Sequence, residues 1–220
     1  MKTLKKIINF LLLNILWVVC SIPLVTIGAS TCAAFYVSLK MVNDEEVQVI
    51  KMFFKAFKQD FMQGTIMLCI TSPCTALCIF MWRFLIKAED KNLLLILGAF
   101  IVTMIIIILN FYSYPLIARY SNTIKNTIRN SAGLTAQHFK STMLTIVVAA
   151  AEIAIMFVIP LVTLLGLFFI PELVIFTISK TAKPIFDEIE NPPAPQPEED
   201  EDEESEDEES EDAEEETDSE

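Results

Sequence analysis

Long apolar runs are the feature that most limits what this chain can fold into. The first extends from Ile7 to Val42 and carries no charged side chain except Lys40. As one helix it would be about 54 Å long, whereas the hydrocarbon core of a bilayer is about 30 Å thick. Soluble domains scatter their apolar residues and do not gather them in runs of about 20. The sequence therefore predicts an all-α membrane protein and excludes an ordinary soluble globule.

Prolines divide the two longest runs into pairs of spans. Pro23 interrupts the first run and Pro160 the last, because proline disrupts the interior of a helix. Two uninterrupted runs lie between them. Together they predict a polytopic transmembrane helical bundle over residues 1–186, with about six spans near 7–22, 25–42, 64–86, 93–114, 142–159 and 161–178.

A lysine-rich amphipathic helix is predicted near 46–62. Aromatic and apolar residues recur there at steps of three and four, and lysines fill the other side. Such a helix either lies in the membrane interface, where anionic headgroups attract its lysines, or packs its aromatic stripe on the bundle. A second basic amphipathic helix is predicted near 117–138. The candidate contact residues for a lipid or protein partner are Phe54, Lys55, Phe57, Lys58, Phe61 and Arg119.

Basic residues set the predicted orientation, because cytoplasmic loops collect Lys and Arg. Six spans place both amphipathic helices and both termini in the cytoplasm. Of the 16 basic residues, only Arg83, Lys87 and Lys91 are then outside. Five spans, with one run re-entrant or tilted, are the alternative, although they put one long basic segment on the wrong side.

The C-terminal segment differs in composition from the rest of the chain. Residues 187–220 hold 21 of the 29 acidic residues and no basic residue. Such a segment repels itself and cannot bury a core, which predicts a disordered acidic tail. A solubilising role is the simplest interpretation, and binding of a basic partner or screening of the protein's own lysines is the alternative.

Glu152 lies in the middle of an apolar run and is flanked by alanines that let a neighbouring helix approach closely. A charged side chain at that depth costs about 2.5–3.5 kcal/mol on insertion scales, so Glu152 should face the bundle or water. Its candidate partners in an intramembrane polar site are Asn14, Thr26, Thr103 and Thr163. The site is either a proton or substrate site, or a neutral carboxyl group that joins helices by hydrogen bonds.

No motif of a known enzyme class is visible in the sequence. The chain has no Walker loop and no G-x-S-x-G or H-E-x-x-H motif, and the lone His138 has no evident catalytic partner. The five cysteines lie in apolar stretches and suggest neither a disulfide framework nor a metal site. We therefore expect no enzymatic activity, no cofactor and no metal. The anionic neighbours of the basic segments are expected to be lipid headgroups rather than nucleic acid.

Several motifs resemble the YesL family of bacterial membrane proteins. They are LNILW at 13–17, PLVTIG at 23–28, FFKAFKQDF at 53–61 and YPLIARY at 114–120. The similarity covers about residues 5–180 and leaves out the tail. It implies an integral protein of a bacterial, Gram-positive cell membrane, associated with carbohydrate uptake and polysaccharide degradation. The family has no established activity, so the resemblance implies no catalytic residue.

The leading functional hypothesis is an accessory or regulatory component of oligosaccharide uptake that acts through protein or lipid contacts. Its expected partners are membrane lipids and either a sugar-transporter permease subunit or a second copy of the chain. The competing hypothesis is a small secondary transporter with a pathway near Glu152. A membrane enzyme ranks last.

Overall fold

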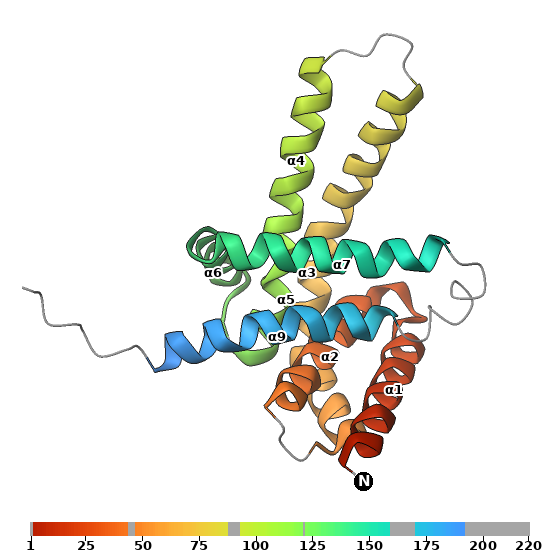
Figure 1. Cartoon of the computed structure of the whole chain (residues 1–220), viewed down its shortest axis with the longest axis vertical. Coiled ribbons are helices and arrows are strands. Elements are labelled where there is room, and N and C mark those ends of the chain that lie inside the picture. The colour runs from red at the N-terminus through yellow and green to blue at the C-terminus, as the bar shows by residue number, and fades with distance from the viewer. Residues whose placement is uncertain (1, 44–46, 88–92, 121, 159–169, 192–220) are drawn as a thin grey trace, which may run out of the picture. The chain divides into compact units, whose positions relative to one another are not determined.

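A computed structural model describes residues 2–43, 47–87, 93–120, 122–158 and 170–191. Within these residues every regular element is a helix, which confirms the predicted all-α class (Figure 1). The elements are α1 (Lys2–Ser21), a 3-10 turn (Leu24–Thr26), α2 (Ile27–Val42), α3 (Val49–Lys87), α4 (Leu93–Phe111), α5 (Ser113–Arg119), α6 (Ile124–Gln137), α7 (Phe139–Val158) and α9 (Ile170–Glu190). The chain divides into two units, Met1–Asp187 and Glu188–Glu220.

The first two helices form a hairpin whose turn contains Pro23. The proline precedes the 3-10 turn with extended backbone angles, because its ring prevents α1 from continuing. Polar side chains then join the two helices. Ser21 Oγ lies 2.7 Å from Ser30 Oγ, and Trp17 Nε1 donates to Thr31 Oγ1 at 3.2 Å. The break thus falls where the sequence places it.

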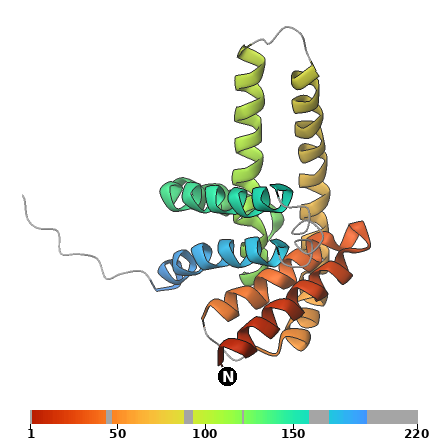
Figure 2. The same cartoon turned by 45° about the vertical axis from the view of Figure 1, so that its right-hand side comes forward.

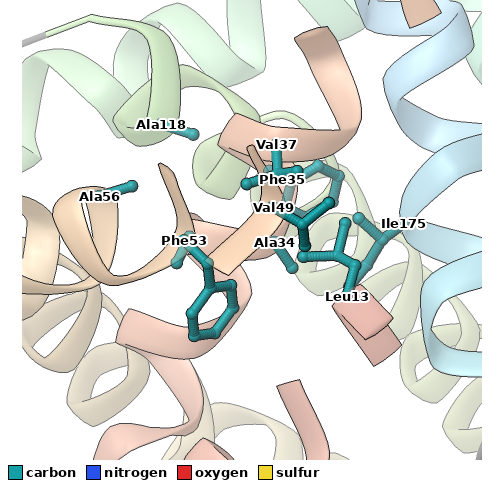
Figure 3. Packing of buried hydrophobic residues seen from close by; sticks show 10 residues of the cluster. Leu13, Ala34, Phe35, Val37, Val49, Phe53, Ala56, Ala118 and Ile175 are labelled. Atoms are coloured by element: carbon teal, nitrogen blue, oxygen red, sulfur yellow. The ribbon is translucent and has the colours of Figure 1, made fainter. Parts of the chain in front are cut away.

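Helix α2 lies at the centre of the packing. Its small residues let neighbouring backbones approach, and Ala33 and Ala34 are completely buried. Larger side chains from other helices fill the space around them. In Figure 3, Leu13 of α1 and Ile175 of α9 lie beside the α2 residues of this cluster, and Phe53 of α3 belongs to the same cluster.

Helix α3 joins two elements that the sequence analysis separates. The lysine-rich segment near 46–62 and the span near 64–86 form one helix of 39 residues, about 58 Å long. The residue between them, Gly64, does not end the helix, since one interior glycine costs only about 0.5–1 kcal/mol. Pro73 also lies inside α3. The amphipathic segment and the span that follows it are therefore parts of one helix.

Helices α3 and α4 run side by side in both Figure 1 and Figure 2. Thr103 of α4 connects them through two contacts with α3. Its hydroxyl oxygen accepts a hydrogen bond from Trp82 Nε1 at 2.8 Å and lies 3.0 Å from Cys78 Sγ. These polar contacts hold together two helices whose other surfaces are strongly apolar.

The second basic segment also differs from its prediction. The helix expected near 117–138 is divided between α5 and α6, and α6 bends by 98° into α7 beside His138. Helix α6 buries a row of hydroxyl side chains, Thr127, Ser131 and Thr135, at steps of four residues. Lys125 and Arg129 are exposed.

The described residues contain fewer membrane-crossing helices than the six expected. Three are long and apolar enough, Leu24–Val42, Val49–Lys87 and Leu93–Arg119, and the bent α6–α7 pair brings the number to four at most. Of the last predicted span, near 161–178, residues 161–169 lie outside the described residues, and the remainder belongs to α9, which runs on through Lys180 and Lys183. The break expected at Pro160 and the predicted tail beyond residue 191 lie outside the described residues.

Candidate functional site

The lysine face of α3, defined as Lys51, Lys55 and Lys58, lies on the exposed side of the helix. These positions share one helical face because they are separated by four and three residues. Phe54 and Phe61 flank the lysines and are 49% and 39% exposed. Four of the predicted contact residues, Phe54, Lys55, Lys58 and Phe61, are therefore accessible together.

Phe57 has a different position from the other predicted contact residues of α3. Its ring stacks on the completely buried Phe53, with centroids 6.1 Å apart, and meets the edge of Phe61 at 5.7 Å. The aromatic stripe thus connects the core to the surface. Its inner rings pack on the bundle, as the second interpretation of the stripe expects, and its outer rings flank the lysines.

The lysine face adjoins the apolar part of the same helix. No charged residue occurs between Phe61 and Trp82. This stretch is about 33 Å long, which matches a hydrocarbon core of about 30 Å. If that stretch fills the hydrocarbon, the three lysines follow within about 15 Å of its boundary, and Lys58 lies nearest to the level of the lipid headgroups.

Arg119 does not join this surface as a free contact residue. It lies at the end of α5, where its Nη2 donates to Asp187 Oδ1 of α9 at 3.3 Å and its guanidinium lies 5.9 Å from the centre of the Phe186 ring. Lys183 also forms an ion pair with Asp187. Arg119 thus fastens α5 to α9.

Glu152 has a hydrogen-bond partner that the sequence analysis did not name. Thr177 of α9 donates to its Oε1 at 2.8 Å, and Oε2 is buried without a partner among the described residues. Along the same pair of helices, Thr145 Oγ1 lies 2.7 Å from Thr181 Oγ1. Helices α7 and α9 are therefore joined by polar side chains, and Glu152 belongs to that contact.

The predicted partners of Glu152 occupy other places. The Asn14 side chain is completely buried, and neither its amide nitrogen nor its oxygen has a hydrogen-bond partner among the described residues. Thr26 closes the first hairpin by donating to the carbonyl oxygens of Cys20 and Pro23. Thr103 joins α4 to α3. Thr163 lies outside the described residues.

A second carboxyl group, Glu172, is the residue that the sequence analysis missed. It is completely buried in the first turn of α9, and its Oε1 accepts a hydrogen bond from Ser38 Oγ of α2 at 2.5 Å. The signal was present in the sequence, because proline followed by an acidic residue is typical of a helix start. What the sequence did not reveal is that this turn lies against α2.

The described residues contain no cluster of three or more His, Cys, Asp or Glu side chains that could hold a metal ion. The polar groups of the structure are instead spread over helix contacts, as hydroxyl groups and single carboxyl groups.

Apolar helices long enough to cross a bilayer, with polar side chains at their contacts, define an all-α integral membrane protein. Residues 10–84 match the family model described as "Protein of unknown function, DUF624", the domain found in YesL-family proteins. The match confirms the family resemblance and includes the motifs at 13–17, 23–28 and 53–61. The motif at 114–120 lies beyond it. No curated protein and no solved structure matches the chain.

Proposed function

We propose that this protein is an accessory component of carbohydrate uptake in a bacterial cell membrane, and that the lysine face of α3 is its contact surface. The observation that carries the proposal is the exposure of Lys51, Lys55 and Lys58 directly beside a span-length apolar stretch. Positive charge at that level attracts anionic headgroups, by about 1 kcal/mol per lysine. The link to carbohydrate uptake comes from the family resemblance and is an analogy.

Contact with lipid holds the face at the membrane surface, and the exposed aromatic rings beside it supply a patch for a protein partner. Phe54 and Phe61 present apolar area next to charge, a combination that favours protein interfaces. A sugar-permease subunit is the proposed partner. Both amphipathic segments and both termini are proposed to be cytoplasmic, because cytoplasmic segments collect basic residues.

The test is photo-crosslinking in cells from position 54, with position 80 as the matched control. Phe54 and Phe80 are both exposed phenylalanines of α3, but Phe80 lies far along the apolar stretch. Capture of a permease subunit from position 54 and not from position 80 is the expected result. Equal capture from both positions, or capture of no protein from position 54, would contradict the proposal.

A small transporter is the second candidate function, and the buried carboxyl groups of Glu152 and Glu172 favour it. Uptake of labelled oligosaccharide into liposomes that contain only this protein would support it over the accessory role. In that case Glu152→Gln should reduce uptake. Absence of uptake together with capture of a permease subunit supports the accessory role.

A further inference from the structure

Three helices meet at an apolar contact that has polar side chains beside it. Leu13 of α1 and Ile175 of α9 pack in the same cluster as Val37 of α2 (Figure 3). Asn14 and Ser38 follow Leu13 and Val37 directly in the chain, and Glu172 lies one turn before Ile175. Asn14, Ser38 and Glu172 are all completely buried.

Only one of the two carboxyl oxygens of Glu172 has a hydrogen-bond partner among the described residues. Ser38 donates to its Oε1, whereas its Oε2 is buried and has no hydrogen-bond partner among the described residues. The N-terminus of α9 offers the carboxyl group a partial positive charge of roughly half an elementary charge. That is less than a buried carboxylate requires, since buried charges are normally paired.

No described basic side chain supplies the missing charge. Among the described residues, Glu172 forms a hydrogen bond with Ser38 and with no titratable or charged side chain of the helices around α9. These side chains belong to Lys5, Lys6 and Cys20 of α1, Cys32, Tyr36 and Lys40 of α2, Lys51, Lys55, Lys58 and Asp60 of α3, Tyr114 and Arg119 of α5, Lys125 and Arg129 of α6, and Lys140 and Glu152 of α7. On α9 itself, Lys183 is paired with Asp187.

We infer that Glu172 and Ser38 form a binding site for a monovalent cation, either a proton or a sodium ion. One carboxylate matches one positive charge, and carboxylate and hydroxyl oxygens are suitable ligands for a small hard cation. A divalent ion is disfavoured because its sites draw on several carboxylates, and the described residues contain no group of three or more His, Cys, Asp or Glu side chains that could hold a metal ion. The proton and the sodium ion do the same thing here, which is to neutralise the buried carboxylate.

The experiment measures thermal unfolding of the full-length protein in detergent, because a ligand that binds only the folded state raises the melting temperature. One series lowers the pH from about 8.5 to about 5.5 without sodium. The other adds sodium chloride at the high pH, with choline chloride keeping the ionic strength constant. A proton site predicts a rise of several degrees in the first series only, and a sodium site predicts a rise in the second.

Glu172→Gln should abolish the response to sodium and reduce the response to pH, because the neutral amide has no charge for a cation to balance. The remainder of the pH response is expected from Asp60 of α3, a second buried carboxyl group with one oxygen that has no partner among the described residues. Glu188→Gln is the matched control, since it makes the same chemical change at an exposed position of α9 and should keep the rise. If Glu172→Gln does not fold, Ser38→Ala takes its place. It should reduce a response to sodium, because it removes one ligand of the ion, and it should increase a response to pH, because it removes a hydrogen bond that favours the charged carboxylate.

The inference is overturned if the wild-type protein responds to neither cation. It is also overturned if Glu172→Gln responds as strongly as the wild type, or if Ser38→Ala in its place leaves the wild-type response to either cation unchanged. The result does not depend on the lysine face of α3, which no step of the experiment involves.

Discussion

Gly28 of α2 and Gly64 of α3 bring two helix backbones into direct contact. A Cβ atom added to Gly64 would lie 2.8 Å from the backbone nitrogen of Ala29 and from the carbonyl carbon and oxygen of Gly28. Real side chains do not approach backbone so closely, so a larger residue must push the helices apart. Glycine is required here by the close approach and not by backbone torsion.

We expect Gly28→Ala and Gly64→Ala each to lower the free energy of unfolding by about 1–3 kcal/mol, the usual cost of overpacking. Thermal unfolding in detergent measures the loss. Gly98→Ala and Gly133→Ala are the controls, because a Cβ at either position meets nothing within 4 Å. These two helix-interior changes should be neutral or stabilising by about 0.5–1 kcal/mol. Equal effects at all four positions would refute the close contact.

Reversing the charge of the lysine face should weaken the retention of anionic lipid. At about 1 kcal/mol per lysine, each Lys→Glu change at Lys51, Lys55 or Lys58 should reduce the affinity roughly fivefold. Native mass spectrometry of the purified protein counts the bound phospholipids. Lys87→Glu, at the opposite end of α3, is the control. Unchanged lipid retention in the triple variant would exclude this face as the lipid contact.

The two ends of α3 should lie on opposite sides of the membrane, because one continuous helix contains both. A cysteine at position 55 should react with an impermeant maleimide only after the cells are opened, whereas a cysteine at position 87 should react in intact cells. Both positions carry exposed lysines. The background protein must lack its five native cysteines. Labelling of both positions from the same side would show that α3 does not cross.

Thr177→Val should destabilise the α7–α9 contact, because it leaves both oxygens of the Glu152 carboxyl group without a partner. The expected loss is about 1–3 kcal/mol, the cost of an unsatisfied buried polar group. Thr177→Ser keeps the hydroxyl group and should recover most of it. Thr75→Val is the control for the effect of a valine in a helix. Thr75 is exposed, and its hydroxyl group donates to a carbonyl oxygen of its own helix. A loss as large at position 75 would argue against the specific hydrogen bond.

Asp187→Asn should loosen the attachment of α9 to α5. The change removes the negative partner of Arg119 and of Lys183, whose side chain is only 8% exposed. Because Asp187 is itself partly exposed, the expected loss is only about 1 kcal/mol. Glu188→Gln again serves as the control. Stability that is the same in both variants would show that these ion pairs contribute nothing measurable.

Local chemistry determined how far the sequence analysis could go. The apolar runs identified the membrane class, because burial in hydrocarbon depends on the local sequence. Pro23 located the first turn, because proline disrupts the interior of a helix. Four short motifs carried the family resemblance. The change from a basic to an apolar segment did not mark the end of a helix. The sequence analysis separates the two segments, yet α3 continues through Gly64, because one interior glycine costs little.

At the candidate sites, too, some features follow from the sequence and others only from the tertiary structure. Sequence alone determined that the protein is a helical membrane protein, that an amphipathic helix near 46–62 carries an aromatic stripe and a lysine-rich side, and that Glu152 needs a polar partner. Only the tertiary structure decided that this partner is Thr177, that Glu172 meets Ser38, and that Gly28 lies against Gly64. Hydrophobicity and helical periodicity add up along the chain and can be summed from the sequence. A hydrogen bond or a backbone contact between helices depends on their relative positions, which no single segment encodes.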